Sequence, residues 1–483
     1  MTQASLLPAE IAGFVFELLR FSDKVTATHV CKRWRDVALA HERLWSRIRC
    51  QSVCILEPLL ERARHVPVDV QVSGISVENL QEILHAISRH LYHIRLLVLE
   101  GAPLLVDHEH IPMVYDCLTQ PAPLLEALDI RIFEDPLLID ALALTNELNA
   151  MRVAPVGLFA EEAPRLAKVS FRAMALPRRH HPASAFSRVT KMELETTFLS
   201  AADLEAIVSL PSLKSLHLEI IDIISLPEAP PPPSFHLEEL WILGPYDVPY
   251  FIPPCPLLWY LGFPHIKHFI SNDDEVWLET MTSSPRGLPH TLLIEHWSLD
   301  ERRGRTTATE AWRLIDGGGF VSDLLDVQTG DQFSWPPAKN VFANLKELVI
   351  PYSQLRQADC DLRLPFLTRL CIRVSDNDRR FLSQAGGVLL YAPCPNLRTL
   401  ELWGGAIPGL LSMPGTVNLV RNDLSLDRRH PPELLIWNPC DASIPIEWDA
   451  FVDVVSGIRY LNEPPPDPFV VELRSSWRTS VED

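Results

Sequence analysis

Glycine and paired cysteine motifs are scarce in this sequence. It has 19 glycines among 483 residues but 42 prolines, so its turns depend on proline more than is usual. The nine cysteines are dispersed and contain no C-x-x-C pair, which excludes the common zinc and thioredoxin-like motifs and indicates reduced thiols. No apolar run approaches the ~18 residues of a membrane span, and the first residues lack the pattern of a secretory signal. We therefore expect a protein of the cytoplasm and/or the nucleus, with no membrane partner.

The signatures of common active sites are also missing. The triplet Gly317–Gly319 is not followed by Lys-Ser/Thr, so it is not a phosphate-binding loop, and no G-x-S-x-G elbow occurs. His108 and His110 lack the i, i+4 spacing of a helical zinc-protease motif. We predict no catalytic residue, no metal site and no cofactor, and hence a non-enzymatic binding protein. One alternative is an enzyme hidden in residues 264–344, where the pattern is least readable.

Positive charge is in short supply as well. The formal net charge is −19, from 43 basic and 62 acidic residues. Residues 1–65 carry ten basic and seven acidic side chains, a balance of +3, which leaves −22 for the rest of the chain. A nucleic-acid-binding surface needs a basic stripe against the phosphates, so we exclude a nucleic-acid partner. The hydrophobic content of 47% is enough for a large core.

The stretch from Leu6 to Ile48 is patterned as three short helices. After Pro8, which suits a first helical turn, apolar residues at positions 11, 14, 15, 18 and 19 form one stripe. Ser22 and Asp23 predict the cap of a second helix, and a third is predicted over about Ala27–His41. A core of fewer than about 70–80 residues rarely supplies more than ~3–5 kcal/mol, and three helices of this size cannot bury so many large side chains among themselves. Its surplus apolar surface must contact the rest of the chain or another protein.

The same stretch matches a known pattern through Leu7-Pro8, Glu10-Ile11, Val15-Phe16, Leu18-Leu19, Asp23, Val30-Cys31-Lys32, Trp34 and Leu44-Trp45. These residues resemble the F-box, the module by which substrate receptors of SCF ubiquitin ligases hold the Skp-type adaptor. The resemblance implies that adaptor as a partner and, through it, a cullin, with an unknown protein substrate held elsewhere. Some of the matching residues must form the core of the bundle instead. The positions that match the adaptor-facing pattern are Leu7, Pro8, Ile11, Val15, Phe16, Val30, Cys31, Trp34, Leu44 and Trp45.

An apolar-x-x-apolar-x-apolar string recurs along the chain. Starts from Leu166 to Leu237 are 23, 24 and 24 residues apart, within the period of about 20–29 that is typical of leucine-rich repeats. Each string predicts a strand whose last two apolar residues point inward, and parallel stacking of the strands closes one core. The polar ladder residue of that family is replaced, for example by Ala102 and Ile221, so the coil should be irregular. The strings start at Ile94, Leu125, Leu166, Val189, Leu213, Leu237, Leu258, Leu345, Leu367 and Leu397.

The predicted fold class is therefore α/β (α+β overall), a three-helix F-box followed by an irregular leucine-rich-repeat solenoid with a parallel sheet. Within it, Leu226–Ser234 is predicted to be a proline-rich loop and Trp448–Leu461 a helix. The predicted limits are 1–49 for the F-box, 50–92 for a linker and first strand–helix unit that caps the repeats, 93–263 for repeats, 264–344 for an insertion or irregular repeats, 345–473 for further repeats and a C-terminal cap, and 474–483 for a disordered tail.

The variable positions of the strands predict an open face that contacts the substrate. Tryptophan and arginine are common anchors of interfaces. The resemblance thus implies the substrate-recognition subunit of an SCF-type E3 ubiquitin ligase. The alternative is a Skp-bound scaffold or interaction protein that acts without ubiquitin transfer. By phase, the exposed candidates are His217, Glu238, Trp241, Arg369, Arg398, Glu401 and Trp403, with Lys214 beside them.

Overall fold

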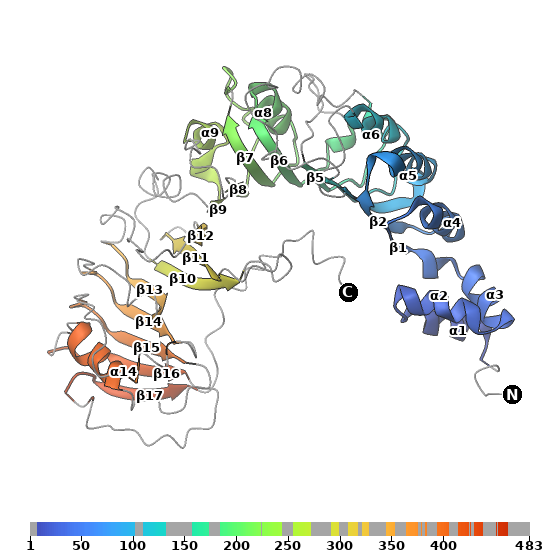
Figure 1. Cartoon of the computed structure of the whole chain (residues 1–483). Coiled ribbons are helices and arrows are strands. Elements are labelled where there is room, and N and C mark those ends of the chain that lie inside the picture. Colours follow the sequence, from blue (N-terminus) through green and yellow to red (C-terminus); the bar gives the residue numbers. More distant parts are fainter. Residues whose placement is uncertain are drawn as a thin grey trace. The chain divides into compact units, whose positions relative to one another are not determined.

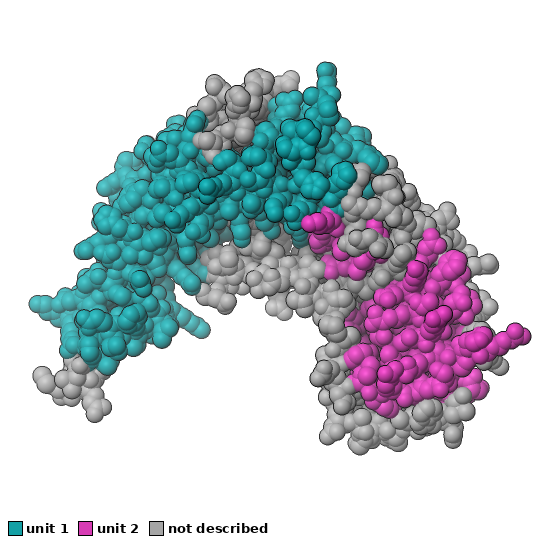
Figure 2. All heavy atoms as spheres, turned by 180° about the vertical axis from the view of Figure 1, so that it is seen from behind, with its two compact units in different colours: residues 1–266 teal, residues 267–483 magenta. Residues whose placement is uncertain are grey.

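The computed structural model combines N-terminal helices with long runs of parallel strands (Figure 1). The chain divides into two compact units, residues 1–266 (unit 1) and 267–483 (unit 2), which Figure 2 colours teal and magenta. The described residues are 7–101, 110–131, 157–172, 184–223, 225–243, 255–271, 291–298, 308–316, 321–327, 344–352, 364–374, 378, 382–383, 394–404, 414–424, 426, 429–437, 451 and 453–461.

Three short helices open the chain, as predicted: α1 (Ala9–Glu17), α2 (Phe21–Val30) and α3 (Lys32–Ala40). Two of the predicted boundaries are wrong. Helix α2 begins at Phe21 without a side-chain cap, so Ser22 and Asp23 lie inside it, and Ala27–Val30 belong to α2 instead of α3. The break falls at Cys31, whose backbone is extended and whose sulfur accepts a hydrogen bond of 3.5 Å from the Trp34 backbone N–H. The thiol thus caps α3, a role that the helical spacing does not show.

Unit 1 contains a parallel sheet whose strands follow chain order from β1 to β8. The predicted strings pair in register, so that the middle apolar residues of successive strands form one buried row. That row is Leu97, Leu128, Val169, Met192, Leu216 and Leu240. The strands are β1 (Arg47–Cys50), β2 (Val68–Ile75), β3 (Ile94–Gly101), β4 (Ala127–Arg131), β5 (Lys168–Arg172), β6 (Lys191–Leu199), β7 (Ser215–Ile223) and β8 (Glu239–Leu243).

Helices accompany this sheet between its strands (Figure 1). The strand–helix unit predicted within 50–92 contains helix α5 (Val77–His90), which buries Leu80, Ile83 and Ile87 and starts with a capping box between Ser76 and Asn79. The prediction of a loop at 226–234 is also confirmed, since this stretch forms no helix or strand. The string at Leu258 is wrongly predicted as a strand, because it forms helix α9 and a 3-10 turn. The remaining helices of unit 1 are α4 (Val53–Ala63), α6 (Ile111–Cys117), α8 (Ala201–Val208) and α9 (Cys255–Tyr260).

Unit 2 contains a second sheet in the order β9-β12-β11-β10-β13-β14-β15-β16-β17. Strand β11 is antiparallel to β10 and β12, whereas all other pairs are parallel. The stretch 264–344 therefore contributes a three-stranded meander to the sheet. The strands are β9 (His268–Ser271), β10 (Thr291–Ser298), β11 (Ala308–Ile315), β12 (Val321–Val327), β13 (Glu347–Pro351), β14 (Arg369–Arg373), β15 (Thr399–Trp403), β16 (Glu433–Trp437) and β17 (Gly457–Leu461), and the short helix α14 spans Pro414–Asn418.

The end of unit 2 corrects a further prediction. The helix predicted over Trp448–Leu461 is wrong for its described residues, because 451 and 453–456 form turns and irregular structure and Gly457–Leu461 is strand β17, paired in register with β16. Val455-x-x-Ile458-x-Tyr460 fits the repeat string, and the partly buried Ile458 pairs in register with Leu434, the last residue of the buried row Leu348, Leu370, Leu400 and Leu434. The predicted tail at 474–483 lies outside the described residues.

Candidate adaptor-docking site

The three N-terminal helices carry most of the large apolar side chains that the described residues expose. Leu18 is 88% and Phe14 54% exposed, values far above those of a core residue. Elsewhere, exposed residues of this kind are single and scattered, which is normal for a soluble protein. A concentration on one small module marks an interaction surface. The exposed residues of the module are Leu7, Ile11, Phe14, Val15, Leu18, Val25, Val30 and Leu39.

Helix α1 is apolar on two faces. Ala12 and Phe16 are buried against the other helices, while Ile11, Val15 and Leu18 point outward. Pro8 precedes the helix as its N-cap residue, and the Pro8 carbonyl accepts the first helical hydrogen bond, from the Ala12 N–H at 3.0 Å. A nine-residue helix cannot turn both faces inward, because side chains at i, i+3 and i+4 share one face. The outer stripe therefore has no partner within the described part of this module.

Three of the predicted adaptor-facing residues instead form the inner packing of the module. Phe16 is buried with its ring 5.2 Å from the Trp34 ring, and Leu44 and Trp45 are each 1% exposed. The Trp45 indole N–H donates to the Ala38 carbonyl at 3.1 Å. These side chains hold the helices together.

Trp45 also ties the helices to the sheet of unit 1. The guanidinium of Arg62, on α4, lies 5.2 Å from the centre of the Trp45 ring. Such a contact is worth about 0.5–2 kcal/mol. Ile48, three residues after Trp45, is fully buried in β1, which pairs with β2. The helices that carry the exposed apolar residues are thus packed directly against the first elements of the sheet region, α4 and β1.

The remaining predicted residues lie at or near the surface. Leu7, Pro8, Ile11, Val15, Val30 and Cys31 are exposed, and Trp34 is partly exposed. Sequence reasoning missed Phe14 and Leu18 as surface candidates, although both lie on the helical stripe of Ile11 and the spacing could have found them. Val25 and Leu39 were also missed, and nothing in their local spacing distinguishes them from core residues.

Basic side chains surround the exposed apolar positions. Residues 7–49 hold eight lysines and arginines against five acidic residues. Arg33 donates to the Leu7 carbonyl and so fixes the start of the module, and Arg35 donates to the Thr28 carbonyl at 2.9 Å. Burial lowers the pKa of Lys24, with Arg47 acting in the same direction. The local charge favours an acidic partner.

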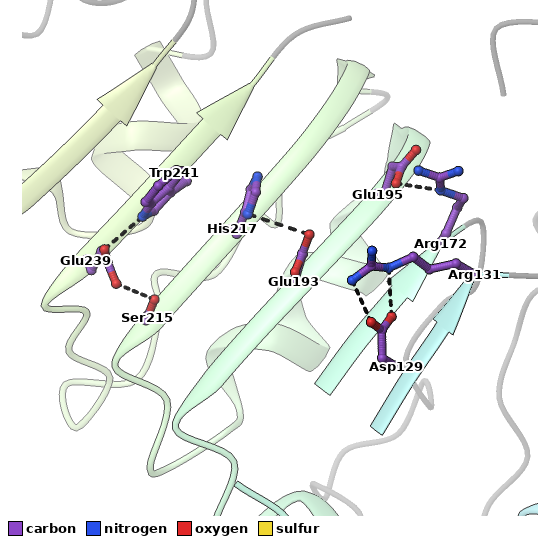
Figure 3. Close-up of polar contacts among 9 residues, drawn as sticks. All are labelled: Asp129, Arg131, Arg172, Glu193, Glu195, Ser215, His217, Glu239 and Trp241. Carbon is purple, nitrogen blue, oxygen red and sulfur yellow. Dashed lines mark hydrogen bonds and ion pairs between the residues drawn. The ribbon is translucent and has the colours of Figure 1, made fainter. Parts of the chain in front are cut away.

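Two substrate candidates of unit 1, His217 and Trp241, lie together on one side of its sheet (Figure 3). His217 and Trp241 occupy paired positions on β7 and β8, with ring centres 5.2 Å apart. His217 Nδ1 lies 3.8 Å from a carboxylate oxygen of Glu193, and the Trp241 indole N–H donates to Glu239 at 2.8 Å. Burial lowers the pKa of His217, which favours the neutral ring. Glu238 instead pairs with Lys214 at 3.3 Å.

Further along the same face, charged side chains neutralise one another (Figure 3). Arg131 donates to both carboxylate oxygens of Asp129 at 2.9 and 2.5 Å, and Arg172 donates to Glu195 at 2.6 Å. Burial raises the pKa of Asp129 to about 6 against the opposing effect of Arg131. The charged side chains Asp129 and Arg131 of β4 and Arg172 of β5 are therefore already engaged in ion pairs.

The other substrate candidates belong to unit 2. Arg398 is exposed, and Trp403 is partly exposed with the Arg373 guanidinium 4.3 Å from its ring centre. The expectation that Glu401 is exposed is wrong, since it is 4% exposed. Its carboxylate accepts from Arg369 Nε and Nη2, on the neighbouring strand β14, at 2.8 and 3.1 Å. Glu401 therefore stabilises the sheet.

Comparison with known families identifies the N-terminal module. Residues 4–51 match the family model described as F-box-like. The chain thus carries an F-box-like domain, and F-box domains bind Skp1-type adaptors and belong to generally non-catalytic proteins. No curated protein matches the chain. Among the described residues, we find no helix with the length and apolar character of a membrane span, and no cluster of three side chains suited to a metal ion.

Proposed function

We propose that this protein is the substrate-recognition subunit of an SCF-type E3 ubiquitin ligase. Its F-box binds a Skp-type adaptor and, through it, a cullin, and its sheets hold a protein substrate. The receptor performs no bond chemistry. It raises the effective concentration of a substrate lysine near the ubiquitin-charged enzyme. Such a complex acts in the cytoplasm and/or the nucleus, consistent with free thiols at the six cysteines whose side chains are described.

The apolar surface of α1–α3 is the observation that carries this proposal. Burial of one exposed leucine or isoleucine contributes about 1.5–3 kcal/mol, so the outer stripe of α1 alone could support a stable interface. The basic side chains around it complement an acidic adaptor. Of the ten predicted positions, we assign Leu7, Pro8, Ile11, Val15, Val30 and Cys31 to the interface, with Trp34 at its edge, and Phe16, Leu44 and Trp45 to the supporting core.

The two sheets would form the substrate-binding part as an irregular leucine-rich-repeat solenoid. In-register rows of buried anchors and short repeat spacings support this architecture. The meander β10–β12 departs from it, since its strands reverse direction. We place substrate contacts on the open side of the strands, opposite the buried rows.

Adaptor capture tests the docking surface. The full-length chain is co-expressed with a Skp1-type adaptor, as wild type, as Ile11→Asp with Leu18→Asp, and as the control Ile55→Asp, which charges an exposed isoleucine of α4. The double variant should weaken capture at least about tenfold, because two apolar contacts become buried charges. The control should capture the adaptor normally. Normal capture by the double variant would refute the assigned surface.

A second measurement separates a ligase subunit from a scaffold. Cells expressing the wild type or the Ile11→Asp/Leu18→Asp variant are compared for the half-lives of the proteins that co-purify with the chain. A ligase subunit should shorten the half-life of a bound protein only when the surface is intact. Equal half-lives, with adaptor capture normal in the wild type, would favour a scaffold that acts without ubiquitin transfer.

A further inference from the structure

The open side of β6–β8 is acidic and carries an ordered aromatic pair. Along 191–195, 215–219 and 239–243, the residues between the buried anchors include four glutamates and one lysine. The aromatic pair is His217 and Trp241. Arg172 of β5 engages Glu195 of β6, and Arg131 of β4 interacts electrostatically with Glu193, so the acidic excess of β6–β8 comes from Glu193, Glu219 and Glu239 against Lys191. The five charged residues are Lys191, Glu193, Glu195, Glu219 and Glu239.

The orientation of Trp241 is fixed by Glu239. Its N–H donates to one oxygen of Glu239, and the Ser215 hydroxyl donates to the other oxygen at 2.6 Å (Figure 3). Lys191 also lies close enough to interact electrostatically with both Glu239 and Glu193. The face of a tryptophan beside a carboxylate is a favourable place for a cation. Within the described part of the chain, no lysine or arginine lies over the Trp241 ring.

His217 completes the polar lining. His217 Nδ1 faces Glu193, and with the proton on this nitrogen the neutral ring has an acceptor at Nε2. This Nε2 atom is buried and has no hydrogen-bond partner among the described residues, so it is not accessible to a group on the surface. The accessible part of the lining offers the carboxylates of Glu193 and Glu239 and an aromatic face, which suits an ammonium or guanidinium group.

In unit 2, a tryptophan on a strand already has a cation over its ring. There, Trp403 also projects from a strand of the sheet, and the guanidinium of Arg373 on the neighbouring strand lies over its ring. The chain therefore supplies its own arginine to one strand-borne tryptophan, whereas Trp241 has a histidine at the paired position. The contrast identifies the kind of group that Trp241 lacks.

We propose that the open side of β6–β8 binds a basic, extended segment of the protein delivered to the ligase, with a lysine or arginine side chain held by Trp241, Glu193 and Glu239. Its role in delivery rests on the proposed function. Its chemistry follows from the charge of this face and the aromatic pair. A delivered protein would present the segment in an unfolded tail or loop, because a folded surface seldom offers an extended strand to a sheet face.

Peptide binding tests the site in the full-length chain. The probe is a short fluorescein-labelled peptide of alternating arginine and threonine, and the reference peptide has glutamine in place of each arginine. Fluorescence anisotropy should show tighter binding of the arginine peptide by about tenfold. The variants Trp241→Leu and Glu239→Gln should each reduce that affinity by about 3- to 30-fold. Trp241→Phe, which keeps an aromatic face but loses the N–H bond to Glu239, should fall between them and the wild type.

Matched controls separate a built site from general attraction to an acidic protein. Trp259→Leu removes an exposed tryptophan of α9, and Glu195→Gln removes a carboxylate of the same face that Arg172 already engages. Both should bind the arginine peptide within about twofold of the wild type, since neither lines the site. Equal binding of the two peptides, equal losses in the controls, or normal binding by Trp241→Leu would overturn the inference.

Adaptor capture by the same variants keeps the two proposals apart. Trp241→Leu and Glu239→Gln should capture the Skp1-type adaptor normally, which also shows that they fold. Loss of the arginine preference in a chain that captures the adaptor overturns this inference alone. An arginine preference in a wild-type chain that does not capture the adaptor overturns the proposed function and retains the basic-segment site.

Discussion

A buried histidine that contacts a second, partly buried one should make unit 1 sensitive to acid. His93, at the junction of α5 and β3, is 1% exposed, and burial lowers its pKa to about 4. Its Nδ1 lies 3.2 Å from the Val66 carbonyl and its Nε2 lies 3.2 Å from His90 Nδ1. The carbonyl can only accept, so Nδ1 carries the proton and Nε2 accepts from His90. Protonation of His93 would break that second bond.

The magnitude follows from the difference between the folded and unfolded pKa values. The unfolded value is 6.5 and the folded value about 4, and each pKa unit corresponds to about 1.36 kcal/mol, which gives about 3 kcal/mol in full. Because the folded pKa is the lower one, the unfolded chain takes up the proton first. The contribution of neutral His93 is therefore complete above pH 6.5 and is lost as the pH falls toward 4. At pH 5, about 2 kcal/mol of the free energy of unfolding should be gone.

Urea unfolding of the full-length chain, followed by circular dichroism at pH 7.5 and pH 5.0, measures this loss. The His93→Gln variant keeps an amide that can donate to Val66 but has no titrating group. Between the two pH values, the wild type should lose about 2 kcal/mol more than His93→Gln. Asp129, whose pKa burial raises to about 6, acts in the opposite direction in both proteins and cancels in the difference. The exposed His236→Gln variant is the control and should follow the wild type. Equal losses in wild type and His93→Gln would refute the reasoning.

Two further predictions concern unit 2 and are measured by thermal unfolding of the full-length chain. Arg369→Met should cost about 3 kcal/mol because it leaves the 4% exposed Glu401 without its guanidinium, whereas Glu401→Gln should cost only about 1–2 kcal/mol because the Arg369 side chain is 36% exposed and can be hydrated. The reverse order would contradict the assignment of Glu401 as the buried partner. Gly415→Ala should cost about 1–3 kcal/mol, since its Cβ would lie 2.8 Å from backbone atoms of Leu382, while Gly457→Ala, with nothing within 4 Å, should be nearly neutral. Similar melting temperatures for the two alanine variants would show that the backbone at Leu382 yields easily.

The elements that depend on local spacing could be predicted from the sequence. Helix α5 and the register of the strands both follow from the positions of apolar residues along a few turns or one strand. Local spacing does not decide between helix and strand where the apolar residues fit both the helical period and the repeat string. Val455 and Ile458 fit a helix with Phe451 and also fit a repeat string, and only pairing with β16 decides between them. At Leu258 the string is present but a helix forms.

Side-chain roles that depend on distant partners could not be predicted. Glu401 was expected to be exposed, because its position in the strand places it on the open side. Its burial comes from Arg369, which is more than 30 residues away in sequence. In the same way, the F-box pattern could not predict the packing of Trp45 against Arg62, because Arg62 lies on α4, outside the F-box stretch. Phe14 and Leu18, by contrast, needed no distant information, because both lie on the apolar stripe that the helical spacing predicts.

The strand directions of the meander β10–β12 allow it to lie between the parallel strands β9 and β13. Each antiparallel contact reverses the chain, so two such contacts, β10–β11 and β11–β12, return β12 to the direction of β10. Strand β10 can then pair in parallel with β13, and β12 in parallel with β9. Only an odd number of strands can be inserted in this way without an antiparallel junction at one flank. The described strands of 264–344 are therefore accounted for as sheet, in a form that lets the parallel rows continue from β13 to β17 and keeps the open side of those strands on one face.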